Sequence, residues 1–387
     1  MTPHLKQLQH KMREAQELFG SGRLDEALMC IDQALAIDPD NAVLHANRGI
    51  ALVALCRLPE ALASFDKAVG LKSDYAEAYF GRAVARLLSG DFARGWVDFE
   101  WRWKRTNGPA GLQRREFAQP LWLGESSLVG KTLLVHAEIG LGDTLQFCRY
   151  VTPLAQLGAT VILQVQSPLV ALLADLHGVS RVVTEGEPLP ALDYHCPLLS
   201  LPLAFKTELE TIPAYRKYLH ADPDKVARWK TRMGDVTGRR VGLVWHGDPN
   251  NPDDRHRSMA LSDLLHQLPV DCRYYSLQKN LTESEKRVFH AHPTASCLAE
   301  ELDLTETAAV CECLDLVISV DTSVAHLSAA LGKATWILLP FSPDCRWLLS
   351  RADSPWYPSV KLYRQESIGD WRGVLTRVAG DLKDRVL

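Results

Sequence analysis

The sequence lacks the long apolar runs that a membrane-spanning helix needs. Its longest apolar runs, such as residues 334–341, fall far short of the ~20 residues that cross a bilayer as a helix. The segment from Met1 to Ala15 holds no apolar core of the kind that a secretory signal carries. We therefore expect a soluble, cytoplasmic protein with no stable membrane insertion.

An excess of positive charge and the common metal-binding motifs are also absent. The 387 residues carry 43 Lys and Arg against 47 Asp and Glu, a net charge of −4, so the charge balance implies no polyanionic partner. The nine cysteines are scattered, and Cys311 and Cys313 match no common zinc spacing. Because the cysteines match no zinc spacing and no His/Glu zinc motif is present, we expect reduced thiols.

What remains is an ordinary globular composition. Hydrophobic residues make up 47% of the chain and charged residues 23%, which fits folded domains and neither a disordered nor a fibrous chain. At roughly 100–200 residues per domain, this length predicts two or three domains.

One pattern recurs in three copies at a period of 34 residues. The positions in register are Gly22, Cys56 and Gly90, then Ala27, Ala61 and Gly95, then Ile31, Phe65 and Phe99, then Ala34 and Ala68. Small residues there let antiparallel helices approach closely, and the apolar spacing supplies the faces that they bury. The pattern resembles the tetratricopeptide repeat over roughly residues 8–105, with departures at Gly95 and Arg102 in the third copy. We assign residues 1–105 to an all-α array of three such repeats.

The resemblance implies a superhelix whose concave face holds a peptide or protein segment. A spacer or a dimerisation surface is the alternative. The array ends in a mixture of aromatic and basic residues: Trp96, Trp101, Arg102, Trp103, Lys104 and Arg105. A stacking surface for nucleic acid would also show this mixture, but we favour a capping helix that docks on the next domain and expect no nucleic-acid partner. Glycines and prolines then predict a linker or docking segment over residues 106–130.

From Lys131 onward, short apolar runs alternate with helical stretches. One set of expected strands covers residues 132–137, 160–165 and the pair around Val182, and a second covers residues 240–245, 273–277, 314–320 and 335–339. Such alternation predicts two doubly wound parallel sheets, which we assign to residues 131–237 and 238–387. A ligand is expected between the halves, at the loops that follow the strands.

The loop after the first strand contains Gly140, Gly142 and Asp143 before a helix expected over residues 145–157. The glycines allow close backbone approach, and a carboxylate at Asp143 could accept a proton from an attacking hydroxyl. An ordinary helix N-cap is the alternative for Asp143.

A second loop contains Asp321, Thr322 and Ser323 before a helix that carries His326 and stops at Gly332. The backbone N–H groups at the start of this helix, with the two hydroxyls, form a plausible diphosphate site. The alternatives are capping for Asp321 and Thr322, and a core histidine satisfied by the backbone for His326.

A third loop, residues 246–257, ends in a basic cluster that includes Arg257. A guanidinium suits a phosphate because it can pair with two oxygens at once, although a solvated charged loop is equally compatible with the pattern. Gln278 and Lys279 close the next strand. They either contact a nucleotide or only cap the strand.

GlyLeuGlyAsp at 140–143 and SerValAspThrSerValAlaHisLeuSerAlaAlaLeuGly at 319–332 together resemble the heptosyltransferase-like glycosyltransferases of family 9, which have the GT-B fold. The similarity covers roughly residues 131–345, and the stretch to Leu387 would complete the second domain, its last helix a candidate to cross back to the first. Repeats joined to such a fold also look like the arrangement of protein O-GlcNAc transferases. This second likeness is one of architecture.

The resemblance implies inverting, metal-independent transfer of a sugar from a nucleotide diphosphate to an acceptor hydroxyl. Asp143 falls on the position of the family's general base, and Asp321, Thr322 and His326 fall on its donor-binding segment. Arg257 lies where the family has a basic residue that neutralises the leaving diphosphate. Ser323 replaces the glycine usually found after the AspThr pair, which puts the closeness of phosphate approach in question.

Two hypotheses follow. The first is a glycosyltransferase that needs no cofactor beyond its nucleotide-sugar co-substrate and modifies a protein held by the repeats. An ADP-heptose-like donor is favoured, and UDP- or GDP-linked hexoses stay open. The second is a catalytically inactive scaffold or nucleotide-sensing module of the same architecture.

Overall fold

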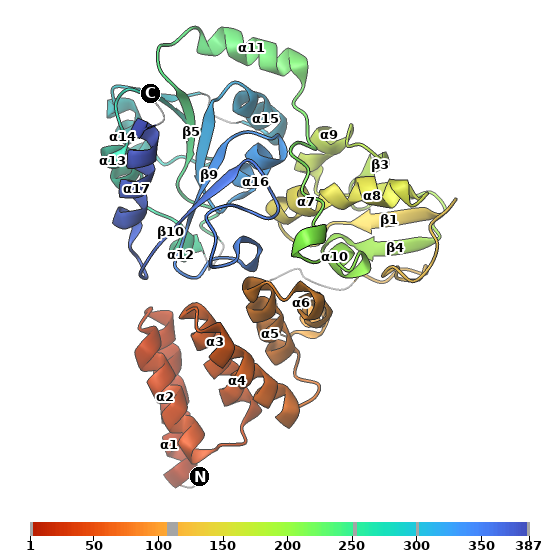
Figure 1. Ribbon diagram of the computed structural model, residues 1–387, viewed down its shortest axis with the longest axis vertical. Helices are drawn as coiled ribbons and strands as arrows, with labels where there is room; N and C mark the ends of the chain where they lie inside the picture. The colour runs from red at the N-terminus through yellow and green to blue at the C-terminus, as the bar shows by residue number, and fades with distance from the viewer. Residues whose placement is uncertain (1–2, 107–114, 251–253, 299–301, 385–387) are drawn as a thin grey trace. The chain divides into compact units, whose positions relative to one another are not determined.

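The structure is a computed structural model and describes residues 3–106, 115–250, 254–298 and 302–384 (Figure 1). The chain forms two compact units. The first comprises residues 1–115 with 206–211 and 341–350, and the second comprises residues 116–205, 212–340 and 351–387.

The first unit is an array of helix pairs. The pairs are α1 (Pro3–Gly20) with α2 (Leu24–Ile37), α3 (Ala42–Ala54) with α4 (Leu58–Leu71), and α5 (Ala76–Ser89) with α6 (Phe92–Phe99), followed by the 3₁₀ helix η1 (Glu100–Lys104). The turns inside the pairs place Gly22, Cys56 and Gly90 in the left-handed region, with φ of 78°, 55° and 89°. The 34-residue register of the turn is therefore confirmed.

Close packing explains the small residues of this array. Ala27 and Ala61 are fully buried. A Cβ added at Gly49 or Gly81 would lie only 2.7 Å or 2.5 Å from the ring of Phe65, so the helices around this ring tolerate no larger residue. The contacts confirm an all-α array of tetratricopeptide-like repeats.

The third repeat departs from the pattern where the sequence does. Arg102 takes the alanine position of the first two copies, is buried, and lies over the rings of Phe99 and Trp103 at 4.8 Å and 4.4 Å. Trp101 stacks on Tyr79, with ring centroids 3.8 Å apart. These rings pack on side chains of their own unit.

Two segments from later in the chain complete the first unit. Residues 206–211 include η5 (Leu209–Thr211), and residues 341–350 include η6 (Cys345–Trp347). The Ser342 hydroxyl donates to the Val53 carbonyl at 3.2 Å, which fastens the second segment to the end of α3.

The second unit begins with a four-stranded parallel sheet of order β3-β2-β1-β4. Its strands are β1 (Thr132–His136), β2 (Thr160–Gln164), β3 (Val179–Val183) and β4 (Tyr194–Pro197). The connections hold α7 (Leu141–Phe147), η2 (Cys148–Tyr150), α8 (Val151–Gln156), η3 (Ser167–Leu169), α9 (Val170–Leu173), η4 (Leu198–Ser200) and α10 (Leu201–Ala204). Of the linker expected over 106–130, residues 107–114 lie outside the described residues, and Leu121 forms a parallel bridge with His195 of β4.

A six-stranded parallel sheet of order β10-β9-β8-β5-β6-β7 follows. Its strands are β5 (Arg240–Val244), β6 (Arg273–Ser276), β7 (Ala295–Cys297), β8 (Leu316–Val320), β9 (Thr335–Leu339) and β10 (Val360–Arg364). The helices of this part are α11 (Pro223–Met233), α12 (Asp254–Arg257), α13 (Leu261–Gln267), α14 (Glu283–Ala291), α15 (Leu304–Glu312), α16 (Ser323–Ala330) and α17 (Trp371–Asp384). Both sheets are parallel with helical crossovers, which confirms the expected α/β fold.

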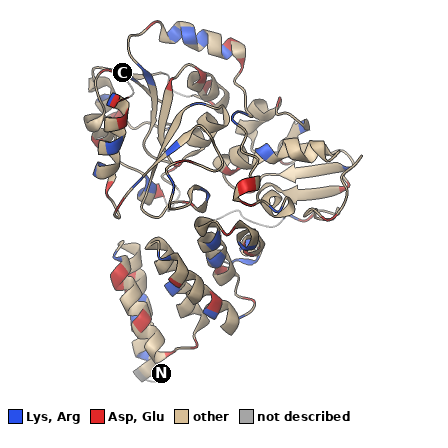
Figure 2. Ribbon diagram, in the orientation of Figure 1, with Lys and Arg blue, Asp and Glu red and all other residues tan. Residues whose placement is uncertain are grey.

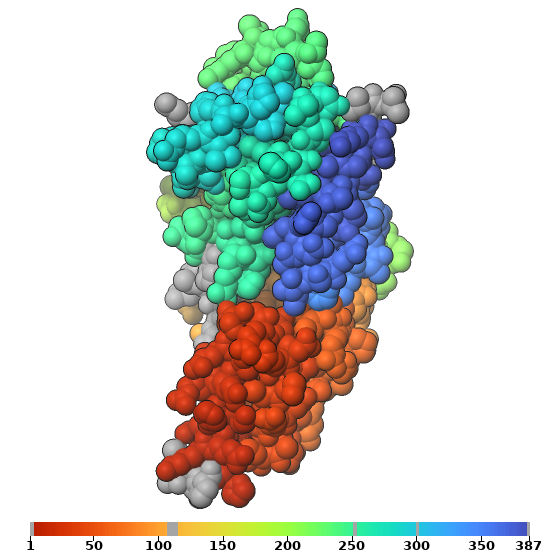
Figure 3. Space-filling view, turned by 90° about the vertical axis from the view of Figure 1, so that its left-hand side faces the viewer, coloured from red at the N-terminus to blue at the C-terminus, as the bar shows by residue number. Residues whose placement is uncertain are grey.

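The last helix stays with the second sheet. Val374, Leu375 and Val378 of α17 are buried in one core with Val241 of β5 and Trp336 of β9. In Figure 3 the dark blue surface of α17 lies against the blue-green segment that contains α13, which it contacts. The alternative that this helix crosses back to the first sheet is wrong, because its apolar face is already buried here.

The helix expected over residues 145–157 is instead divided into α7, η2 and α8. Pro153 has no N–H to donate to the preceding turn, so it fits the first turn of a new helix rather than the middle of a long one.

Helix α11, rich in Lys and Arg (Figure 2), packs on α15, where the Trp229 indole donates to Glu306 at 2.6 Å. Among the described residues, no helix is both long and apolar enough to cross a membrane.

Candidate functional site

The six-stranded sheet changes direction between β5 and β8. These two strands are neighbours, yet the chain continues from β5 toward β6 on one side and from β8 toward β9 on the other. In open parallel sheets the crevice at such a switch point, beyond the carboxyl ends of the strands, is where ligands bind. The two loops that leave these ends begin at Trp245 and Asp321.

Helix α16 starts directly after β8 with its first turn uncapped by its own N-cap side chain. Thr322 is the N-cap residue but makes no capping hydrogen bond, and its hydroxyl instead lies 3.0 Å from the Ser319 hydroxyl. The first turn also contains no acidic residue. Because the N-terminus of a helix carries partial positive charge, this start suits an external anion.

His326 lies one turn into α16 and is buried. Its Nδ1 lies 2.8 Å from the Tyr357 hydroxyl, and its Nε2 lies 3.6 Å from Asp321 Oδ1. The sequence did not reveal Tyr357, which lies 31 residues downstream of His326. Two neighbours thus fix the ring's orientation beside the start of the helix.

The GlyLeuGlyAsp loop of the first sheet meets this same helix. A Cβ at Gly142 would lie 2.9 Å from His326 Cδ2 and 3.7 Å from the Cα of Ser323, so only glycine allows the observed approach of α7 to α16. The two sequence motifs, about 180 residues apart, therefore share one site.

Asp143 occupies the third position of α7, and Gly140 is the N-cap residue. The N-cap alternative for Asp143 is therefore wrong. A Cβ on Gly140 would lie 2.7 Å from Asp143 Oδ2, which shows that the carboxylate turns back toward the start of its own helix. The side chain is partly exposed, as a group that meets a substrate must be.

Arg257 reaches the same place from the third loop. Its Nη1 donates to the Asp321 carbonyl at 2.7 Å, and its Nε donates to Asp254 Oδ1 at 3.1 Å. The guanidinium thus lies beside the residue that leads into α16. This contact joins the second and third loops of the sequence analysis.

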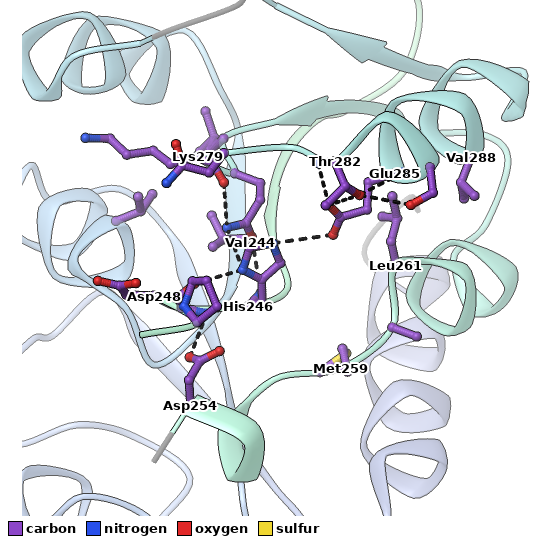
Figure 4. Close-up of a pocket in the computed structure, with 18 of the residues that line it drawn as sticks. Val244, His246, Asp248, Asp254, Met259, Leu261, Lys279, Thr282, Glu285 and Val288 are labelled. Carbon is purple, nitrogen blue, oxygen red and sulfur yellow. Dashed lines mark hydrogen bonds and ion pairs between the residues drawn. The ribbon is translucent and has the colours of Figure 1, made fainter. Parts of the chain in front are cut away.

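A cavity of about 790 Å³ opens next to these groups (Figure 4). Leu141 of α7 and Ser323 of α16 line one part of it, and Gln278, Lys279 and the first turn of α14 line another. The residues that line it also include Val244, His246, Gly247, Asp248, Asp254, Met259, Leu261, Thr282, Ser284, Glu285, Val288 and Val324. Its volume is within the range of small-molecule and cofactor pockets.

Gln278 caps a strand end as well as lining the cavity. Its Oε1 accepts the backbone N–H groups of both Trp245 and His246 at 3.1 Å. Lys279 is exposed at the mouth of the cavity. Gln278 therefore fastens the loop after β5 to the end of β6.

Sequence reasoning missed the group formed by Trp245, His246, Thr282 and Glu285. The Trp245 indole donates to Glu285 Oε1 at 2.7 Å, and His246 Nε2 lies 3.4 Å from the same oxygen. Burial raises the pKa of Glu285, but hydrogen bonds from Thr282 and Trp245 outweigh it and hold that pKa below its ordinary value. Thr282 followed three residues later by Glu285 is a capping-box pattern, a signal that the sequence did carry.

Potential metal ligands do not cluster in the described part of the chain. No group of three or more His, Cys, Asp or Glu side chains there is arranged to hold an ion.

Comparison with known proteins gives likenesses to a family model, to a curated protein and to solved structures. Residues 275–338 match the model of glycosyltransferase family 9 (heptosyltransferase). Protein FlbA of Caulobacter vibrioides is 26% identical over 389 residues, an alignment that covers 92% of this chain and 64% of FlbA, so the chain spans less than two thirds of that relative. A family 9 glycosyltransferase from Veillonella parvula is 11% identical and matches 67% of this chain and 99% of its own, with a TM-score of 0.51.

A shorter match covers the repeats only. The first tetratricopeptide repeat domain of Spaghetti (RPAP3), bound to an HSP90 peptide, is 28% identical over 25% of this chain and 76% of its own, with a TM-score of 0.24. The family-model match supports a heptosyltransferase-like glycosyltransferase, and the Veillonella structure supports a GT-B-like α/β fold for the part of the chain that follows the helical array in sequence. The matched segment 275–338 contains the strand, loop and helix that carry Asp321, Ser323 and His326.

Proposed function

We propose that the chain transfers a sugar from a nucleotide diphosphate to an acceptor hydroxyl, with inversion and without a metal. The observation that carries the proposal is the packing of Gly142 on His326, which brings the loop of Asp143 to the start of α16 beside the cavity. Asp143, which can accept a proton, is thereby brought near the start of α16, which suits an anion. Glycosyl transfer needs this combination.

In the proposed reaction, the donor's diphosphate binds at the start of α16. Backbone N–H groups there, with the hydroxyls of Thr322 and Ser323, face the phosphate oxygens, and Arg257 supplies a fixed positive charge. As the bond between the anomeric carbon and the diphosphate breaks, the leaving group takes the electron pair. The helix start and the guanidinium stabilise the charge that develops on it.

Asp143 acts on the other side of the anomeric carbon. Its carboxylate takes the proton of the acceptor hydroxyl while the oxygen forms the new glycosidic bond. Attack opposite to the leaving diphosphate inverts the configuration. His326, held by Tyr357 and Asp321, packs against Gly142 and so fixes how closely the two loops approach each other.

The donor and acceptor classes follow from the family likeness and the repeats. We propose an ADP-heptose-like donor, with UDP- and GDP-linked hexoses as the tested alternatives. The repeats would recruit a protein or peptide that carries the acceptor hydroxyl, since arrays of this kind commonly hold polypeptide segments. The site would work in the cytoplasm on a nucleotide sugar.

The decisive experiment compares Asp143→Asn with Asp321→Ala. Asp143→Asn should reduce sugar transfer by about a thousandfold, within the range of general-base contributions, while nucleoside diphosphate affinity changes less than twofold. Asp321→Ala should remove the thermal stabilisation that ADP, UDP, GDP or CDP gives the parent. Equal transfer by Asp143→Asn and the parent would exclude Asp143 as the base, and no response to any of the four nucleotides would favour the inactive scaffold.

A further inference from the structure

Asp254 is a buried carboxylate in a loop that faces the cavity. It is 6% exposed and its two oxygens accept three hydrogen bonds. Oδ1 accepts the Gly247 N–H at 2.9 Å and Arg257 Nε at 3.1 Å, and Oδ2 accepts the Ser258 hydroxyl at 2.7 Å. These donors take the place of the water that burial removes from the carboxylate.

These bonds fix the direction of Arg257. An arginine side chain loses much rotamer freedom when it is held, and a planar guanidinium held at two of its nitrogens has a defined plane. Asp254 holds Nε and the Asp321 carbonyl holds Nη1 at 2.7 Å. The third nitrogen, Nη2, lies next to Gly247.

The absence of a side chain at Gly247 gives this pair its space. A Cβ at this position would lie 2.2 Å from Asp254 Oδ1 and 2.6 Å from Arg257 Nη2. Either the carboxylate or the guanidinium would have to move to admit a side chain. Figure 4 shows the Asp254 carboxylate below His246, on the side of the cavity away from Glu285.

We propose that Asp254 is a positioning residue that holds the Arg257 guanidinium at the start of α16, and that Gly247 is required because it makes room for this pair. The inference rests on the proposed function, since a preset guanidinium serves a diphosphate that binds at the start of α16. The effect of Asp254 on binding passes through Arg257.

The first test needs no ligand and uses the full-length chain. In arginine-labelled protein, the Nε–H resonance of Arg257, assigned by its loss in Arg257→Lys, should exchange slowly with solvent. Asp254→Asn should move that resonance and speed its exchange, because the charged acceptor is gone. The same signal in Asp254→Asn and the parent would overturn the proposal. Asp263→Asn, an exposed aspartate on the first turn of α13, is the matched control.

The second test is a double-mutant cycle on nucleoside diphosphate affinity, measured by calorimetry with whichever of ADP, UDP, GDP and CDP binds the parent most tightly. Arg257→Ala and Asp254→Asn should each weaken binding on the order of tenfold, the size expected for a charge-assisted hydrogen bond. The double variant should bind within about twofold of Arg257→Ala alone. A further tenfold loss on adding Asp254→Asn to Arg257→Ala would overturn the proposal.

Two more variants test whether the loss of affinity depends on the Asp254–Arg257 pair. Gly247→Ala displaces the pair without deleting either partner and should match Asp254→Asn, which keeps the test valid if one variant fails to fold. Arg255→Ala, a neighbour whose Nε contacts His256 instead, should bind like the parent. If Arg257→Ala also binds like the parent, the proposed diphosphate role of Arg257 fails, while the Nε–H signal still decides whether Asp254 holds it.

Discussion

Helices α14 and α16 both begin at the same cavity, and their first turns are built in opposite ways. Helix α14 satisfies its own start: Thr282 and Glu285 form a reciprocal capping box, and Glu283 adds a second carboxylate. Helix α16 has neither a capping hydrogen bond from Thr322 nor an acidic residue in its first turn. One end of the cavity is therefore neutralised from within the chain, and the other is prepared for an outside anion.

This difference gives the proposed donor a direction. Two carboxylates at the start of α14 would repel a diphosphate, whereas the start of α16 and Arg257 would attract one. We therefore propose that the diphosphate binds at α16 and that the uncharged nucleoside binds nearer α14. The three predictions below test this contrast.

The largest effect, a loss of nucleoside diphosphate affinity, is expected from a carboxylate placed at the start of α16. Ser323→Asp would place a negative charge about 5 Å from a bound diphosphate, a repulsion of roughly 3 kcal/mol at an effective dielectric constant near 20, or on the order of a hundredfold in affinity. The same change favours the helix itself, so the melting temperature of the unliganded protein should hold or rise. Calorimetry with the nucleoside diphosphate and thermal unfolding measure the two effects.

The matched control is Ser284→Asp. This residue lines the same cavity at the start of α14, which already carries two carboxylates. We expect a loss in nucleoside diphosphate affinity several times smaller than that of Ser323→Asp. Equal losses would mean that the anion does not distinguish the two helix starts, and the contrast between them would be wrong.

Removing the N-cap hydroxyls should give an effect of intermediate size on stability. Thr282→Ala breaks the capping box and should lower the free energy of unfolding by about 1 kcal/mol. Thr322→Ala should cost less, because its hydroxyl makes no capping bond and meets only Ser319. Urea unfolding of both variants measures the difference, and a larger cost for Thr322→Ala would contradict the capping assignment.

The sequence predicted some of the strands that position the site and missed others. Strands β5, β8 and β9 were predicted because short runs rich in Val, Ile and Leu are typical of buried parallel strands. Three strands were missed for physical reasons. β7 is only three residues long, β4 has four residues and ends in Pro197, and β10 at the sheet edge alternates Lys361 and Arg364 with apolar residues.

The three loops of the candidate site could be expected to lie near one another because the strand ends of a parallel sheet gather at one edge. The residues that their side chains contact could not be predicted. Tyr357 reaches His326 across 31 residues and Glu285 reaches Trp245 across 40, and no period or motif encodes such pairs. The sequence did not mark Asp254 as a site residue, because it lies in an acidic, asparagine-rich stretch that is typical of a solvated loop. Its burial in the structure distinguishes it from its neighbours in that stretch.

The smallest effect is a pH dependence that belongs to α14. Because Glu285 has a lowered pKa in the folded state, its carboxylate contributes stability above its ordinary pKa of 4.5 that is lost as the pH falls through the lower folded value. Glu285→Gln lacks this contribution, so it should melt below the parent at neutral pH, and the gap should narrow as the pH falls below 4.5. Melting curves from about pH 6 to about pH 3.5 measure the gap, and the partial exposure of Glu285 keeps it small. A gap that stays constant over this range would show that the charge of Glu285 does not stabilise the fold, and Glu283 alone would then distinguish the start of α14 from that of α16.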